Sequence, residues 1–170
     1  MIIIGLGANQ PGRLGSPRQT IVAALDVLAR EAGDIVARSR LYRSAPVPAS
    51  DQPWFINAVA AIKTLLSPEE LLTLLHRVEA RFGRERRLRN EARVLDLDLI
   101  AYDDRVEPKV DQGGTLTLPH PRMHERAFVL LPLAEIAPGW VHPRFGLTVA
   151  QLIARLPPGQ TAEPLDSRSD

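Results

Sequence analysis

Apolar and acidic residues alternate from Leu95 to Leu99, which is the period of a β-strand. Side chains two positions apart on a strand point to the same face, so Asp96 and Asp98 are predicted to project together. At a rise of roughly 3.3 Å per residue, these two positions lie about 6–7 Å apart. Leu95, Leu97 and Leu99 take the opposite face, where we expect them to pack against helices.

Two longer helices are predicted from their start signals. Ser16 precedes a proline and is followed three residues later by Gln19, which is the pattern of a capping box at a helix N-terminus. Ser67 and Glu70 repeat this pattern, and apolar residues recur at helical spacing after each pair. The expected helices are 17–32, 68–82 and a last helix after Thr148. The expected strands are 2–6, 35–43, 55–62 and 116–118, with an edge strand at 140–141.

The composition is that of a soluble globular domain. Of the 170 residues, 45% are hydrophobic and 24% charged, and the net charge of +1 does not indicate a nucleic-acid protein. There is no cysteine, which suits a reducing compartment, and no apolar run approaches the roughly 20 residues of a membrane span. We expect a cytoplasmic protein with a single domain over residues 1–156 and a loose tail at 157–170.

Two carboxylates on one strand face repel each other unless a cation or strong donors lie between them. Mg²⁺ is a suitable cation because it binds through one or two carboxylates plus substrate phosphates. The alternative is an exposed strand with two ordinary surface acids.

An arginine run stands directly before this strand, with six arginines in the thirteen residues 81–93. It can be a solvated face, a nucleic-acid patch or a set of phosphate-binding guanidinium groups. The neighbouring carboxylates favour phosphate, and no aromatic residue for base stacking is interleaved from Arg84 to Arg93. Arginines beside a metal site are the parts needed to hold a nucleoside triphosphate.

Asn57 is the only polar residue in the apolar strand pattern from Phe55 to Ile62. A buried amide needs hydrogen-bond partners, so Asn57 is either a satisfied structural residue or a side chain that reads the edge of a heterocycle. Phe55 shares its strand face and could stack on such a ring. His76 and Glu79 lie off the apolar stripe of their helix, which favours solvated helix residues for both.

Several short motifs occur in one order and together resemble the 6-hydroxymethyl-7,8-dihydropterin pyrophosphokinase family. They are Gly7-Ala8-Asn9, Tyr42-Arg43-Ser44, Asp51-Gln52-Pro53, Asn57-Ala58, Gly83-Arg84, Arg93-Val94-Leu95-Asp96-Leu97-Asp98-Leu99-Ile100, Leu118-Pro119-His120 and Arg126-Ala127-Phe128. The resemblance extends from about Ile2 to about Leu156. It implies an α+β fold, ferredoxin-like, in which an antiparallel sheet is flanked by helices in three α/β/α layers.

The resemblance also implies transfer of pyrophosphate from ATP to 6-hydroxymethyl-7,8-dihydropterin in folate biosynthesis, giving AMP and the pterin diphosphate. Asp96 and Asp98 would hold two Mg²⁺ ions and act in catalysis together with Arg84 and Arg93. The residues implied to bind ATP are His76, Arg84, Arg93, Leu99, Leu116, Thr117, His120 and Arg126. The residues implied to bind the pterin are Ser44, Ala45, Val47, Phe55, Asn57 and Phe128. Glu79 matches a position that supports the site, and the general base is left open between Asp96 and a metal-bound water.

Two other functions remain open. Glu91-Ala92 stands where the family usually has a small pair such as Gly-Pro, which motivates an inactive relative that binds pterin or nucleotide. The arginine run motivates an RNA- or DNA-binding module. The enzyme is favoured over both, because acidic, arginine and aromatic elements are all present. We expect a monomer that binds neither nucleic acid nor a membrane.

Overall fold

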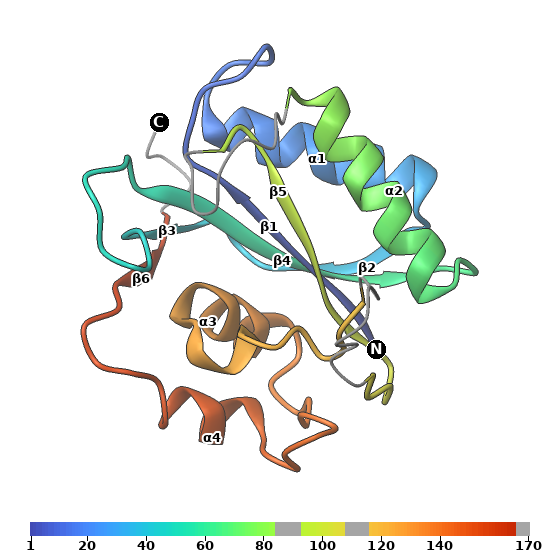
Figure 1. Ribbon diagram of the computed structural model, residues 1–170, viewed down its shortest axis with the longest axis vertical. Coiled ribbons are helices and arrows are strands. Elements are labelled where there is room, and N and C mark those ends of the chain that lie inside the picture. Colours follow the sequence, from blue (N-terminus) through green and yellow to red (C-terminus); the bar gives the residue numbers. More distant parts are fainter. Residues whose placement is uncertain (84–92, 108–115, 166–170) are drawn as a thin grey trace.

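The chain folds around a six-stranded antiparallel β-sheet. The computed structural model describes residues 1–83, 93–107 and 116–165. In sheet order the path is β5-β1-β4-β3-β6, and β2 also pairs with β4, so β1 and β4 are central (Figure 1). The strands are β1 (Ile2–Ala8), β2 (Asp34–Arg38), β3 (Tyr42–Ser44), β4 (Phe55–Lys63), β5 (Asp96–Tyr102) and β6 (Ala162–Pro164).

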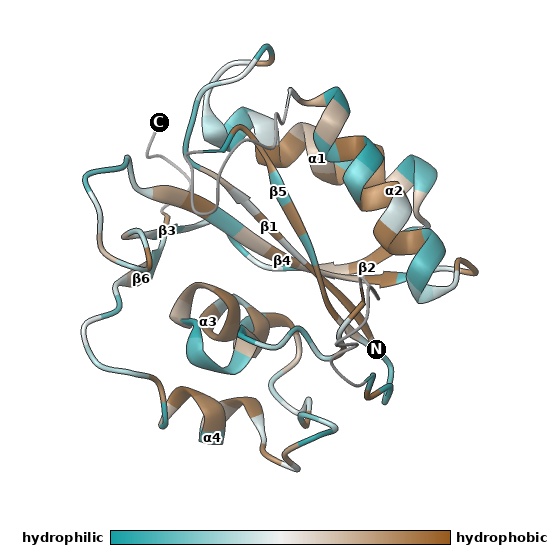
Figure 2. Cartoon of the chain, viewed as in Figure 1, coloured by the Kyte–Doolittle hydropathy of each residue, from teal (hydrophilic) through white to brown (hydrophobic). Residues whose placement is uncertain are grey.

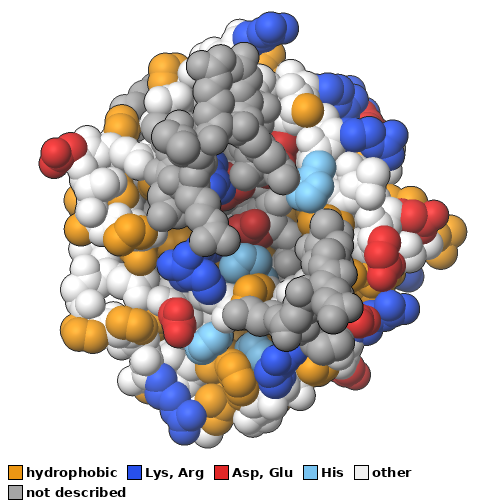
Figure 3. Space-filling model, viewed as in Figure 1, with side chains coloured by type: hydrophobic (Ala, Val, Ile, Leu, Met, Phe, Trp, Pro, Cys, Tyr) orange, Lys and Arg blue, Asp and Glu red, His pale blue; other side chains and the backbone are white. Residues whose placement is uncertain are grey.

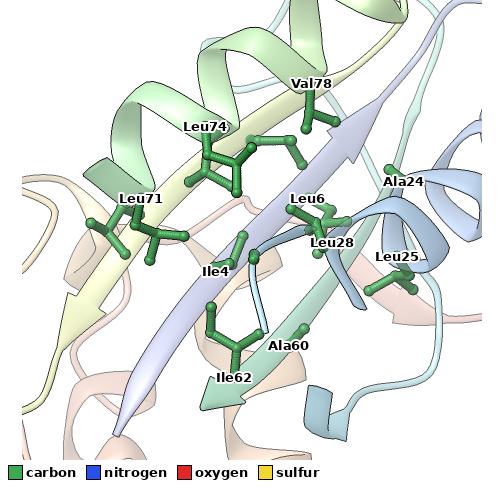
Figure 4. Close-up of a cluster of buried hydrophobic side chains, with 14 of the residues drawn as sticks. Ile4, Leu6, Ala24, Leu25, Leu28, Ala60, Ile62, Leu71, Leu74 and Val78 are labelled. Atoms are coloured by element: carbon green, nitrogen blue, oxygen red, sulfur yellow. The ribbon is translucent and has the colours of Figure 1, made fainter. Parts of the chain in front are cut away.

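Helices α1 (Pro17–Glu31) and α2 (Pro68–Arg81) cover one face of the sheet (Figure 1). Both begin with the predicted capping boxes, built by Ser16 with Gln19 and by Ser67 with Glu70. Their apolar stripes pack on alternate residues of the strands, because side chains two apart share a sheet face. The core on this side includes Ile4, Leu6, Ala24, Leu25, Leu28, Ala60, Ile62, Leu71, Leu74 and Val78 (Figure 4).

The other face of the sheet carries α3 (Ala127–Ile136), α4 (Val149–Ile153) and the 3-10 turn η1 (Met123–Glu125). Helix α3 is apolar on nearly all sides because it packs between the sheet and α4 (Figure 2). It covers the part of the sheet around Ile3 and Ile100. The α+β fold with an antiparallel sheet between two helical layers is thereby confirmed.

The predicted strand 35–43 is wrong as a single strand, because its two halves pair with different parts of β4. Strand β2 pairs with the end of β4 from Ala60 to Lys63, whereas β3 pairs with its beginning from Phe55 to Asn57. Ser39 lies at the break, where its backbone and hydroxyl both bond to Val59.

The C-terminal segment also differs from the loose tail expected at 157–170. Residues 162–164 form β6, which pairs with β3, while 166–170 lie outside the described residues. Two other expected strands are absent from the part of the chain that the structure describes. Residues 116–118 form no strand and include a bend at Leu118, and Val141 forms only an isolated bridge with Thr148. Over the same described ranges, no helix is long and apolar enough to cross a membrane.

Candidate active site

A cavity of about 570 Å³ opens on the same side of the sheet as α3, over the part of that face that α3 does not cover. Its floor comes from β1, β4 and β5, where Gly7 stands in register with Asn57 on one side and Asp96 on the other. Its walls are the loop at 45–52, the segment at 120–126 and the start of α3. In Figure 3, acidic, basic and histidine side chains gather around a hollow near the centre of the face.

Small residues keep the cavity floor flat. A Cβ atom at Gly7 would stand 3.3 Å from Asn57 Oδ1, and one at Gly5 would stand 3.2 Å from Ile100. Both glycines lie on the cavity side of β1, because the alternate residues Ile4 and Leu6 face the core on the other side of the sheet. A larger side chain at either position would occupy space that a ligand needs.

Asp96 and Asp98 both line this cavity, whereas Leu95, Leu97 and Leu99 are buried in the core on the opposite face. The predicted division of the strand into two faces is therefore confirmed. Each acid faces a guanidinium group. Asp96 forms an ion pair with Arg93 Nη1, and Asp98 Oδ2 lies 4.0 Å from Arg126 Nη1.

The expectation that Glu79 is a solvated helix residue is wrong. Its side chain is 1% exposed, and its Oε1 accepts a hydrogen bond of 2.7 Å from the backbone N–H of Leu97. Leu97 is the residue between the two cavity aspartates. Glu79 therefore anchors β5 to α2 at the point from which both carboxylates project.

Asn9 supports the cavity without being one of the residues that line it, and its only sequence signal is the short Gly7-Ala8-Asn9 motif. It is 2% exposed. Its Oδ1 accepts from Arg93 N at 2.7 Å, and its Nδ2 donates to Gln52 Oε1 at 3.2 Å and to Pro53 O at 3.1 Å. Asn9 N also donates to Arg93 O at 2.9 Å. One buried amide thus ties Arg93 to the loop that forms the opposite wall of the cavity.

Arg126 and His120 stand on the wall opposite that loop. Burial lowers the pKa of Arg126, an effect that Asp98 opposes, and its guanidinium lies 5.4 Å from the centre of the Phe128 ring. Burial and the charge of Arg126 lower the pKa of His120 to about 4, so its ring is neutral at neutral pH. His120 Nδ1 accepts from Arg122 N at 3.2 Å. The ring proton is therefore on Nε2, which can donate to an anion.

The remaining wall combines aromatic rings with one amide. Asn57 is 4% exposed, and its Nδ2 donates to Ser44 Oγ at 2.8 Å. Phe55 and Phe128 line the same cavity from β4 and α3, so two rings border one space from different elements. Ser44, Ala45 and Val47 complete this side.

Some predicted site residues do not line the cavity. Leu99 is buried in the core behind β5, and Leu116 packs against the same core. His76 and Thr117 are also not among the described residues that border it. Arg84 and Glu91 lie outside the described residues. The ATP-binding roles predicted for His76, Arg84, Leu99, Leu116 and Thr117 stay predictions.

The two aspartates fit a hard divalent cation. Their side chains are 21% and 37% exposed, and both border the cavity. Among the described residues no three His, Cys, Asp or Glu side chains form a metal-binding group. A two-carboxylate site suits Mg²⁺, because this ion commonly completes its octahedral shell with water and substrate phosphates.

The site as a whole combines acidic and cationic groups at one end with an aromatic and amide wall at the other. This arrangement suits an enzyme that moves a phosphoryl-type group between a nucleotide and a flat, polar heterocycle.

Comparisons with known proteins narrow this class. The chain is 44% identical over 155 residues to a 2-amino-4-hydroxy-6-hydroxymethyldihydropteridine pyrophosphokinase from Synechocystis sp., covering 91% of this chain and 75% of that protein. A protein of the same name from Methylorubrum extorquens is 42% identical over 156 residues, with 91% and 92% covered. The model of the 7,8-dihydro-6-hydroxymethylpterin-pyrophosphokinase family matches residues 3–138. The chain belongs to this family.

Solved structures agree on the fold. A Plasmodium falciparum HPPK-DHPS triple mutant crystallised with SDX-DHP superposes with a TM-score of 0.71 at 15% identity. The match covers 91% of this chain and 44% of that longer chain. At this identity the likeness shows the fold alone.

Proposed function

We propose that this protein transfers the terminal diphosphoryl group of ATP to the hydroxymethyl oxygen of 6-hydroxymethyl-7,8-dihydropterin. The new bond joins this oxygen to the β-phosphorus, the hydroxyl O–H bond and the bond between the β-phosphorus and the α,β-bridging oxygen break, and AMP and a proton are released. One observation carries the proposal. The paired acids and arginines share a single cavity with the Phe55, Asn57 and Phe128 wall.

The phosphate end of the cavity would be held by cations. Asp96 and Asp98 would bind two Mg²⁺ ions, which supply charge neutralisation for the phosphates when bound. Arg93 and Arg126 would each exchange part of their contact with an aspartate for a phosphate oxygen, and His120 would donate from Nε2. Arg84 is proposed to join them. Positioned charges of this kind provide most of the catalysis in phosphoryl transfer.

The aromatic end of the cavity would hold the pterin. Phe55 and Phe128 would stack on its two faces, and Asn57 would present its amide to the ring edge. Because Asn57 Nδ2 is engaged with Ser44, its Oδ1 beside Gly7 is oriented to accept a hydrogen bond. A flat polar ring needs this combination of two apolar faces and a fixed hydrogen-bond partner.

The nucleoside would extend over β5, which is one of the edge strands of the described sheet. His76, Leu99, Leu116 and Thr117 are proposed to border it there. We further propose that the protein works as a monomer in the cytoplasm, without nucleic acid or a membrane as partner.

The test is product analysis after incubation with ATP, Mg²⁺ and the hydroxymethyl pterin. AMP should appear in equal amount with the pterin diphosphate. Asp98→Asn keeps the size of the side chain but removes its charge, and it should slow the reaction by about a thousandfold or more. Asp34 is exposed on β2, so Asp34→Asn serves as the matched control and should retain full activity.

Release of ADP instead of AMP would contradict the proposed reaction. Tight pterin or nucleotide binding without AMP would instead favour the inactive relative. Affinity for RNA or DNA that falls steeply with salt would favour the nucleic-acid module. Full activity of Asp98→Asn would contradict the metal role.

A further inference from the structure

The segment 160–165 crosses from the start of α3 to the edge of the sheet and touches both walls of the cavity. At one end, Gln160 Oε1 accepts from Ala127 N at 2.9 Å and Gln160 Nε2 donates to Glu125 O at 2.6 Å. At the other end, β6 pairs with β3, and Thr161 O accepts from Ala45 N at 3.2 Å. We call residues 160–165 the C-terminal strap. It lies beyond residues 3–138, which the family model matches.

Helix α3 lacks a cap of its own. Its N-cap residue is Arg126, which makes no side-chain capping bond. The first N–H groups of a helix have no partner inside the helix and need one from elsewhere. Gln160 supplies it from 33 residues away, since its amide accepts from the first residue of α3. The same amide donates to the last carbonyl of η1, so one side chain joins the two elements.

The residue enclosed between these two bonds is Arg126. Its neighbours Glu125 and Ala127 are both fixed by Gln160, which sets the direction in which the arginine leaves the backbone. Arg126 Nη1 reaches to 4.0 Å from Asp98. Phe128 follows one residue after Ala127 and packs under the same guanidinium at 5.4 Å. Gln160 thus holds the backbone on both sides of Arg126 and directly before Phe128.

The strap also holds the opposite wall. Strand β3 ends at Ser44, which bonds Asn57, and both Ser44 and Ala45 line the cavity. The antiparallel pairing of Ser44 with Ala162 sets this wall against β6. The Arg43–Glu163 ion pair at 2.7 Å adds little, because both side chains are about half exposed. The backbone ladder and the Gln160 amide are the principal links.

We propose that Gln160 is a positioning residue, which orients Arg126 and Phe128 for the two substrates by capping α3. This inference rests on the proposed function for its kinetic consequence. Removing the amide leaves Ala127 N–H and Glu125 O without their partners, so the first turn of α3 loosens and both side chains lose their fixed direction. The pterin should be affected most, because Phe128 loses its place against the ring.

The experiment compares Gln160→Ala with Gln19→Ala at a temperature where both variants are folded. Gln19 Oε1 accepts from Ser16 N at 2.8 Å at the start of α1, which lies across the sheet from the cavity. Gln160→Ala should weaken pterin binding, measured by calorimetry, and raise the pterin KM by about tenfold. A change of this size is what the loss of hydrogen bonds of ordinary strength causes. Gln19→Ala should change neither value. Gln160→Glu keeps the acceptor but not the donor and should be intermediate.

Hydrogen exchange provides a readout that does not depend on activity. The amide protons at the start of α3 should exchange faster in Gln160→Ala than in the parent protein, and should be unchanged in Gln19→Ala. Unchanged exchange there, or pterin binding equal in the two alanine variants, would overturn the strap proposal. A parent protein that makes no AMP refutes the proposed function instead, and the exchange experiment still decides whether Gln160 caps α3.

Discussion

Replacing Asn9 with alanine tests whether a single buried amide holds the two sides of the cavity together. The change removes three side-chain hydrogen bonds, to Arg93 N at 2.7 Å, Gln52 Oε1 at 3.2 Å and Pro53 O at 3.1 Å. The bond from Asn9 N to Arg93 O at 2.9 Å remains, because it uses the backbone. Arg93 is therefore loosened but not released.

The expected loss of stability follows from these contacts. Hydrogen bonds between neutral groups contribute about 1 kcal/mol each, so Asn9→Ala should lower the free energy of unfolding by about 2–3 kcal/mol. Asn9→Asp keeps an acceptor for Arg93 N–H but cannot donate to Gln52 or Pro53, and it should retain more of the activity. Urea unfolding measures the stability of each variant.

Steady-state kinetics measure the consequence for the site. Because Arg93 pairs with Asp96 and is proposed to bind phosphate, we expect kcat for Asn9→Ala to fall by about tenfold to a hundredfold, the range that follows from misplacing a charged group. If the free energy of unfolding of Asn9→Ala lies within about 0.5 kcal/mol of the parent protein's and its kinetics are unchanged, Asn9 does not hold the two sides of the cavity together.

Three further predictions test other contacts. Phe128→Ala should raise the pterin Kd by roughly twofold to tenfold, since a stacked aromatic pair contributes about 0.5–1.5 kcal/mol; an unchanged Kd by calorimetry would contradict the stacking role. Glu79→Ala should lower stability by about 2–3 kcal/mol, because Leu97 N–H loses its buried partner; stability equal to the parent in urea unfolding would count against the anchor. Burial lowers the pKa of both His120 and His142 to about 4, so the unfolded chain binds more protons between pH 6.5 and 4. Stability should therefore decline as the pH falls through this window, and a flat profile of unfolding free energy against pH would refute this.

The parts of the fold that depend on neighbouring residues could be predicted from sequence. The alternation from Leu95 to Leu99 fixed which side of β5 faces the cavity, because strand geometry leaves only two faces. The capping boxes at Ser16 and Ser67 located the starts of α1 and α2, because both partners lie within one helical turn.

The elements that were missed depend on distant contacts. Helix α3 has no polar face to reveal a helical period, since it is enclosed by the sheet and α4. Strand β6 is a short Ala-Glu-Pro segment whose only strand signal is its pairing with β3. In sequence alone, β6 cannot be distinguished from a loop, and α3 cannot be distinguished from an apolar run of undefined secondary structure.

The residues of the site could also be predicted only in part. Asp96, Asp98, Phe55 and Asn57 were found from strand pattern and chemistry, and the structure places all four around one cavity. Asn9 and Glu79 enter only through the family resemblance, because their partners Arg93 and Leu97 lie 84 and 18 residues away in sequence and no local pattern reveals the contacts. A Gly-x-Asn loop and a glutamate off a helical stripe have many ordinary explanations, and only the three-dimensional fold distinguishes them.

Asp96 and Asp98 are proposed to be the metal anchor between the two substrates. A crystal structure grown with Mn²⁺, a non-hydrolysable ATP analogue and the hydroxymethyl pterin tests it directly, because Mn²⁺ is located by its anomalous scattering. Two anomalous peaks are expected, each within about 2.0–2.3 Å of aspartate and phosphate oxygens, with the pterin between Phe55 and Phe128. Metal bound away from both aspartates, or a pterin outside this cavity, would contradict it.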